Sequence, residues 1–280
     1  MRLRGVRGSR NVEDRRGRGG AGRGAGLGGV GLLLVLALGY FAGIDVSPLL
    51  QDQAGYGQSD EARELTPQEV QAGEFAARVL ATTEMVWTDK FPELTGRAYE
   101  PPVMVLYSGV TQSPCGDASG ATGPFYCPAD KKAYLDTEFF ATMSQQLGAK
   151  GDFAAAYVIA HEVAHHVQNE LGILPQVNQR RQAVGQTEAN QLTVRLELQA
   201  DCLSGVWARA VEGALEPGDL EEALNAAKQI GDDTLQRRAG RVPQPHTFTH
   251  GSSAQRQRWF ALGFETGDAR QCDTFGRERL

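Results

Sequence analysis

The pattern of hydrophobic and polar positions divides the chain into a region of mixed elements and a longer helical region. Residues 103–107, flanked by proline and Ser-Gly, and residues 132–136 are predicted to be strands. Residues 66–69 form a capping box with proline at the first helical position, which predicts a helix to about residue 89. From residue 138 onward the chain is predicted to be mostly helical. The fold class is therefore α+β, mostly helical with a small sheet.

A stretch of 18 residues, 27–44, carries no charge and is rich in leucine and glycine. It is barely long enough to cross a bilayer, and membrane helices tolerate glycine. Arginines precede it and acidic residues follow it, so the positive-inside rule predicts a transmembrane anchor with a cytoplasmic N-terminus. The alternative is a cleaved signal peptide, whose cleavage site would fall at Ala37–Gly39, inside the apolar core, or near Ala42, where Tyr40 interferes.

These patterns predict four segments. They are an Arg-rich cytoplasmic tail (1–26), the anchor (27–44), a linker (45–65), and one domain (66–280) on the periplasmic or extracellular side of the cell membrane. The net charge of the chain is −6, although the first 26 residues carry eight arginines against Glu13 and Asp14. The domain is thus acidic, which argues against a nucleic-acid partner. The oligomeric state does not follow from the sequence.

Four cysteines allow three disulfide pairings. Cys115 and Cys127 bracket a loop rich in Gly, Ser and Pro, which favours a bridge between them and leaves Cys202 to pair with Cys272. Disulfides form in oxidising compartments, in agreement with the predicted topology. Four buried thiols in a cytosolic protein are the alternative.

The candidate chemistry lies in H-E-V-A-H at residues 161–165, within a predicted helix from 153 to 171 that contains neither proline nor glycine. We expect Asp152 to be its N-cap. Residues four apart lie on one helix face, so His161 and His165 can reach one metal ion. Glu162 projects to the side, where it can hydrogen-bond a metal-bound water. Two histidines on an ordinary helix are the alternative.

A catalytic zinc site needs a third protein ligand, and Glu197 and Asp201 supply the candidates. They are four apart in an apolar stretch, so we expect both on one face of a second, buried helix. One carboxylate can bind the metal while the other accepts the N–H of a ligating histidine. The alternative is two solvated carboxylates, but buried and unpaired acids are costly.

Several segments together resemble a known family. Residues 161–169 followed by E-L-Q-A-D at 197–201 are similar to the gluzincin pattern, in which H-E-x-x-H is completed by E-x-x-x-D on the next long helix. More closely, the chain resembles the bacterial putative neutral zinc metallopeptidase family at residues 11–17, 123–128, 161–169, 195–207 and 248–260. The resemblance implies a zincin-like domain in which Zn²⁺ is bound by His161, His165 and Glu197, with Glu162 as catalytic base and Asp201 as the partner of a ligand.

Further predictions concern substrate binding and the remaining histidines. In zincins a strand just upstream of the metal helix commonly binds an extended peptide by strand addition, and residues 132–136 occupy that place; an interior strand without a ligand is the alternative. His250 is a candidate for stabilising the oxyanion formed during hydrolysis, with a helix cap or structural hydrogen bond as the alternative. His246 is expected to be structural or exposed. His166 points about 100° away from His165 around the helix and is not expected to share the metal.

These residues predict a membrane-anchored zinc endopeptidase that hydrolyses peptide bonds in a peptide or protein substrate. The alternative is a non-catalytic, zinc-stabilised cell-envelope protein that acts as a binding or chaperone-like module. An open fourth coordination position and an intact Glu162 favour the enzyme, because a structural zinc site needs no base. The sequence does not identify the substrate or its cleavage preference.

Overall fold

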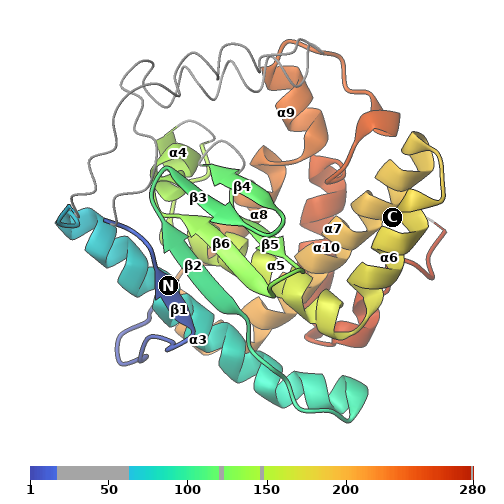
Figure 1. Ribbon diagram of the computed structural model, residues 1–280. Helices are drawn as coiled ribbons and strands as arrows, with labels where there is room; N and C mark the ends of the chain where they lie inside the picture. Colours follow the sequence, from blue (N-terminus) through green and yellow to red (C-terminus); the bar gives the residue numbers. More distant parts are fainter. Residues whose placement is uncertain (18–62, 120–122, 146–147, 279) are drawn as a thin grey trace.

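The computed structural model describes residues 1–17, 63–119, 123–145, 148–278 and 280 (Figure 1). The strands are β1 (Val12–Asp14), β2 (Val103–Tyr107), β3 (Val110–Ser113), β4 (Gly116–Ser119), β5 (Phe125–Cys127) and β6 (Lys132–Asp136). The helices are α3 (Pro67–Thr95), α4 (Phe139–Gln145), α5 (Asp152–Glu170), α6 (Ile173–Gln182), α7 (Gln186–Ala210), α8 (Asp219–Gln229), α9 (Asp232–Arg238) and α10 (Ser253–Thr266), with 3-10 turns η1 (Glu212–Ala214), η2 (Pro245–Thr247) and η3 (Ala269–Cys272). The protein is thus mostly helical with a small mixed sheet, as predicted.

The sheet has the strand order β1-β2-β6-β5, with β1, β2 and β6 parallel and β5 antiparallel to β6. Both predicted strands are present with the predicted bounds, and β3 and β4 form a separate antiparallel pair. Strand β6 is hydrogen-bonded to β2 on one side and to β5 on the other. Residues 132–134 therefore have partners on both sides, and residues 135 and 136 pair with β2. Strand β6 thus lies inside the sheet, which contradicts the prediction that residues 132–136 offer an edge for strand addition.

Helix α3 begins at the predicted capping box, where the Thr66 side chain accepts from the Glu69 backbone N–H. It extends to Thr95 rather than to about residue 89, because its buried face continues through Trp87 and Phe91, each 1% exposed. It ends at Gly96, whose φ of 69° lies in the left-handed region that glycine adopts most easily.

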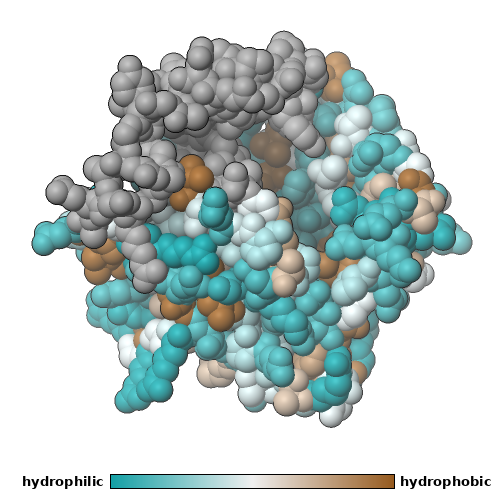
Figure 2. Space-filling view, in the orientation of Figure 1, coloured by the Kyte–Doolittle hydropathy of each residue, from teal (hydrophilic) through white to brown (hydrophobic). Residues whose placement is uncertain are grey.

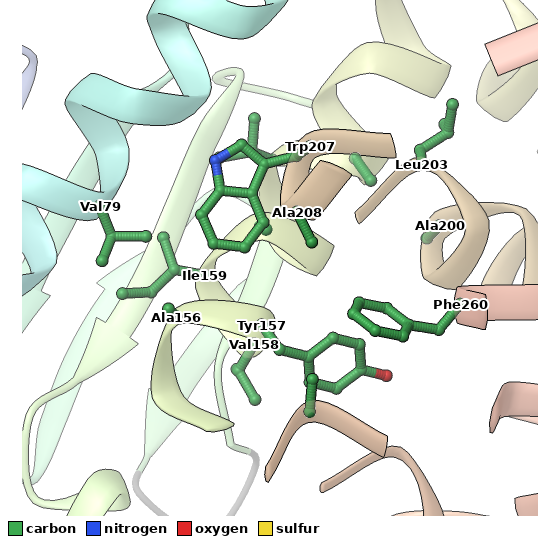
Figure 3. Close-up of a cluster of buried hydrophobic side chains, with 14 of the residues drawn as sticks. Val79, Ala156, Tyr157, Val158, Ile159, Ala200, Leu203, Trp207, Ala208 and Phe260 are labelled. Carbon is green, nitrogen blue, oxygen red and sulfur yellow. The ribbon is translucent and has the colours of Figure 1, made fainter. Parts of the chain in front are cut away.

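The core is built around α5 and α7 (Figure 3). Trp207 of α7 stacks on Phe153 of α5 with ring centroids 5.6 Å apart, and its Nε1 donates to Thr82 Oγ1 of α3 at 3.1 Å. Tyr157 of α5 meets Phe260 of α10 edge to face at 5.4 Å. Because all four rings are fully buried, α5, α7 and α10 are held in a fixed arrangement, and these are the helices that carry the candidate site.

The two predicted disulfide bridges, Cys115–Cys127 and Cys202–Cys272, are both present. The first connects the turn between β3 and β4 to strand β5, and the second connects α7 to η3. On the face shown in Figure 2, hydrophilic side chains predominate and hydrophobic ones appear as separate spots.

The first 17 residues pack against the rest of the domain. Strand β1 pairs with β2, with Glu13 opposite Val105. The amine of Met1 lies 2.8 Å from a carboxylate oxygen of Asp152 at the start of α5. Gly17 and Arg63 are neighbours in space, because the Arg63 backbone N–H donates to the Gly17 carbonyl at 2.9 Å.

These contacts correct the predicted topology. A single-pass anchor would place its two flanks on opposite faces of a bilayer, separated by a hydrocarbon core of about 30 Å, whereas residues 17 and 63 are hydrogen-bonded to each other. Within the described part of the chain, no helix combines the length and the apolar character needed to cross a membrane. These findings overturn the prediction of a transmembrane anchor and of a single-pass protein with a cytoplasmic N-terminus; the stretch 27–44 itself lies outside the described residues.

Glu13 provides a test of how strongly β1 is held. Its carboxylate accepts from Arg15 Nε at 2.8 Å and from Lys132 Nζ of β6 at 2.6 Å, and these two donors lower the pKa of Glu13 to about 2. We expect Glu13→Gln to lower the free energy of unfolding at pH 7 by about 1 kcal/mol, a discounted value because the carboxylate is partly exposed. Urea unfolding measures this change.

The pH dependence of this effect has a definite sign. Because the pKa is lower in the folded state, the stabilisation by Glu13 is complete above the ordinary value of 4.5 and is lost as the pH falls toward 2. The difference between wild type and Glu13→Gln should therefore shrink to less than half at pH 3. Glu74→Gln, which alters an exposed ion pair with Arg78, serves as the control and should change stability little at either pH. Equal effects of Glu13→Gln at pH 7 and pH 3 would contradict the assignment.

Candidate metal centre

Helix α5 carries the H-E-x-x-H residues. It begins at Asp152, because Gly151 with a φ of 102° precedes it as N-cap, so the predicted N-cap is one residue off. His161 and His165 lie one turn apart with ring centroids 4.8 Å apart, as the four-residue spacing predicts. Their side chains are 8% and 13% exposed, so both imidazoles are almost enclosed by the protein.

Helix α7 brings Glu197 to the same point. Glu197 Oε2 lies 3.0 Å from His161 Nε2, and Glu197 Oε1 lies 3.5 Å from His165 Nε2. Glu197 and Asp201 lie on one face of α7, as predicted. Their carboxylates contact different nitrogen atoms of the histidine rings. Glu197 faces both Nε2 atoms, whereas Asp201 Oδ1 lies 3.0 Å from His161 Nδ1, on the other side of the ring.

The Asp201 carboxylate is held by two residues that the motif does not contain. Arg256 of α10 donates to it through Nε at 2.8 Å and Nη2 at 2.9 Å, and the Tyr157 hydroxyl donates to it at 2.5 Å. Arg256 is 2% exposed and Asp201 is fully buried. Burial raises the pKa of Asp201, but Arg256 outweighs this effect and the net shift is downward, so Asp201 is ionised beside His161. In the sequence, the signal that points to Arg256 is a charged residue on the helix face that also carries Trp259 and Phe260.

His165 has a different kind of support. Its Nδ1 lies 2.9 Å from Oε1 of Gln168, which is three residues further along α5 and completely buried. Sequence reasoning missed Gln168. A polar residue one turn after a metal-ligand candidate, in an otherwise apolar helix, is the signal that would have found it.

The donor set fits a zinc ion. One ligand atom from each of His161, His165 and Glu197 lies within 4.8 Å of the other two. The observed separations of 3.0 and 3.5 Å bracket the spacing of about 3.3 Å between ligands on a tetrahedral ion with bonds near 2.0–2.1 Å. Both Nδ1 atoms face acceptors, so both Nε2 atoms remain for a metal, and three protein ligands leave a fourth position open.

The charges around the space between His161, His165 and Glu197 favour binding of a cation. Burial alone would lower the pKa of His161, but the carboxylates of Asp201 and Glu197, each 3.0 Å from a ring nitrogen, raise it to about 10. The pKa of His165 is also raised, because Glu197 outweighs the effect of burial. Burial opposes ionisation of Glu197 as well, yet the neighbouring histidines hold its pKa well below the usual value. Glu197 and Asp201 therefore stabilise positive charge at the two histidines that lie between and beside them.

Glu162 differs from Glu197 in its surroundings. Burial raises the pKa of Glu162, and His165 and His161 offset this only in part. A carboxylate with a raised pKa accepts a proton more readily than an ordinary glutamate does. Glu162, with a raised pKa, thus lies on the helix of the two histidines, and Glu197, with a lowered pKa, lies opposite them.

The predicted site residue His250 lies at the edge of this centre. It precedes α10, which begins at Ser253, and its side chain is half exposed. Asp232 Oδ2 accepts the backbone N–H groups of Thr249, His250 and Gly251 at 2.7, 2.6 and 2.9 Å. Asp232 Oδ1 lies 3.5 Å from His250 Nδ1. Glu197 raises the pKa of His250 although burial opposes the shift, so the two side chains interact electrostatically.

The side chains of the other two histidines have partners or surroundings apart from the candidate metal ligands. His166 Nδ1 contacts the Tyr126 hydroxyl at 3.0 Å, and its Nε2 contacts the Glu100 carbonyl at 2.7 Å, which ties α5 to the sheet side of the molecule. The side chain of His246 is exposed. Both positions agree with the sequence predictions.

Two helices thus present an H-E-x-x-H pair of histidines completed by a glutamate, and comparison with known proteins points to the same class. The model of the family described as putative neutral zinc metallopeptidase matches residues 1–275. The chain is 48% identical over 289 residues to the Escherichia coli K12 protein YpfJ, with 99% of both chains covered. It is 44% identical over 219 residues to Mycobacterium bovis Mb2605, covering 72% of this chain and 71% of that one.

Both relatives bear names that describe them as uncharacterized proteins. No solved structure matches the chain significantly. The match over nearly the whole length shows that the chain belongs to the putative neutral zinc metallopeptidase family, which confirms the resemblance seen in the sequence.

Proposed function

We propose that this protein is a zinc-dependent endopeptidase that hydrolyses peptide bonds in a peptide or protein substrate. The observation that carries the proposal is the convergence of His161 Nε2 and His165 Nε2 on Glu197, with Glu162 on the same helix as the two histidines. Membership of the family supports zinc as the metal.

The residues have separate roles in this proposal. His161, His165 and Glu197 hold the zinc ion, which when bound supplies Lewis-acid polarisation of the scissile carbonyl and acidifies a water molecule. Glu162 takes a proton from the attacking water and delivers it to the leaving amine. His250, oriented by Asp232, donates a hydrogen bond to the oxyanion that develops on the carbonyl oxygen. Asp201 keeps the His161 ring in place.

Cleavage of a broad peptide library tests the proposal. We expect the purified protein to cleave peptides, to lose this activity in the presence of a chelator, and to regain it when zinc is added back. Mass spectrometry of the products identifies the cleaved bonds and separates internal cleavage from removal of terminal residues. A zinc-loaded, folded protein that cleaves nothing would favour the alternative of a zinc-stabilised binding module.

A further inference from the structure

A chain of hydrogen bonds connects His165 to the C-terminal part of the molecule. His165 Nδ1 lies 2.9 Å from Gln168 Oε1, and Gln168 Nε2 donates to the Leu196 carbonyl at 2.8 Å and to Gln199 Oε1 at 3.1 Å. Gln199 Nε2 in turn donates to the Cys272 carbonyl at 2.9 Å. Gln168 is fully buried and Gln199 is 6% exposed, so water has little access to these bonds.

The direction of every bond in this chain is determined by its two backbone ends. The carbonyls of Leu196 and Cys272 can only accept, so both glutamines must turn their NH₂ groups toward them. The amide oxygen of Gln168 therefore faces His165, and Nδ1 of His165 must carry the proton. In the neutral imidazole, which is the form that binds a metal ion, this tautomer leaves the proton off His165 Nε2, the atom that faces Glu197.

The last acceptor in this series of hydrogen bonds is the carbonyl of Cys272, a residue that a disulfide holds in place. Cys272, at the end of η3, forms a disulfide with Cys202 of α7, and both residues are buried. Cys202 is three residues after Gln199 on the same helix, so the bridge holds the Cys272 carbonyl close to the Gln199 amide. His161 is supported differently, because its partner Asp201 is an ionised carboxylate paired with Arg256.

We propose that Gln168 and Gln199 are positioning residues that keep His165 in its metal-binding tautomer and orientation, and that the Cys202–Cys272 disulfide sets metal affinity through them. The inference rests on the proposed zinc site. Without the bridge the Cys272 carbonyl is held less firmly, although hydrogen bonds between Thr274 and Arg195 still connect this segment to α7. The acceptor of Gln199 is then less well fixed, and so is the orientation of the Gln168 amide. Hydrogen-bond partners of metal-ligating histidines commonly contribute 10–100-fold to metal affinity.

A double-mutant cycle tests the connection. Apparent zinc dissociation constants are measured by chelator competition for the wild type, Gln199→Met, the pair Cys202→Ala with Cys272→Ala, and the combination of all three changes. Gln199→Met keeps the length of the side chain but neither accepts from Gln168 nor donates to Cys272. We expect Gln199→Met and the double cysteine variant each to weaken zinc binding by about tenfold. The combined variant should bind zinc no more weakly than Gln199→Met alone.

The second disulfide provides the matched control. Cys115→Ala with Cys127→Ala removes a bridge of the same kind that has no place in the hydrogen-bond chain, and we expect zinc affinity to stay unchanged. The visible absorption of the Co²⁺-loaded protein, which reports ligand geometry, should change with Gln199→Met and with loss of the Cys202–Cys272 bridge, but not with the control. A general loss of stability would not produce this difference.

The outcomes separate the two proposals. If the wild type binds no zinc, the metal site and the inference built on it are both overturned. If the wild type binds zinc but loss of the Cys202–Cys272 bridge weakens binding equally with and without Gln199, the hydrogen-bond chain alone is overturned. Should the double-alanine variant fail to fold, Gln199→Met decides by itself, because unchanged zinc affinity in that variant contradicts the proposal.

Discussion

Replacing Glu162 by glutamine is expected to lower peptidase activity by at least about 10²-fold while zinc remains bound. The amide has nearly the size of the carboxylate, so the helix and the two histidines beside it keep their positions. It cannot accept a proton from water, however, and burial has already given Glu162 the raised pKa that suits a base. The rate of peptide cleavage and the zinc content of the same preparation are the two measurements.

Glu170→Gln is the matched control for this experiment. Glu170 lies on the same helix, but it pairs with Lys131 at 2.8 Å and has no contact with the metal ligands among those described. We expect nearly wild-type activity from it. If Glu162→Gln cleaves peptides as fast as the wild type, Glu162 is not the base. If the variant loses activity and zinc together, the substitution has disturbed the metal site, and Glu162→Asp, which keeps a carboxylate, tests the base instead.

Removal of the Glu197 carboxylate should have the largest effect on the metal. We expect one zinc ion per wild-type chain, and a loss of affinity in Glu197→Ala that exceeds the 10–100-fold effect of losing a partner of a ligand. The reason is that Glu197 is the group on which both Nε2 atoms converge, at 3.0 and 3.5 Å. Elemental analysis after dialysis against a weak chelator measures the effect.

Glu188→Ala provides the comparison on the same helix. Glu188 is half exposed and pairs with Arg180 near the start of α7, so its loss should leave the zinc content unchanged. Full retention of zinc by Glu197→Ala would remove Glu197 from the ligand set and direct attention to Asp201 as the third ligand.

The sequence by itself determined those features that depend on neighbours along the chain. The four-residue spacing of His161 and His165 guarantees that they share a face once the segment is helical, and the same holds for Glu197 and Asp201. The capping box at Thr66 and both strands could be predicted because local hydrogen bonds and side-chain alternation depend on residues only a few positions apart. The cysteine pairing followed from the composition of the loop between Cys115 and Cys127 and from elimination.

Only the tertiary structure decided how these local features meet. Whether residues 132–136 form an edge or an interior strand depends on β5 and β2 pairing with it, and nothing within the strand itself reveals this. The apolar stretch 27–44 suggested a topology that the hydrogen bond between residues 17 and 63 excludes, since hydropathy takes no account of where the flanking segments pack.

The partners of the candidate metal ligands were likewise decided by the tertiary structure. Arg256 lies 55 residues after Asp201, and Gln199 lies 73 residues before the carbonyl it contacts, so no local pattern connects them. The sequence gives the chemistry of the candidate site because metal-ligand spacing is a property of one helix turn. The packing of α5 against α7 and α10 decides which carboxylate faces the proposed metal position, which nitrogens of the two histidines face acceptors, and which side chains hold the candidate ligands in place. These features depend on contacts between segments that are distant along the chain.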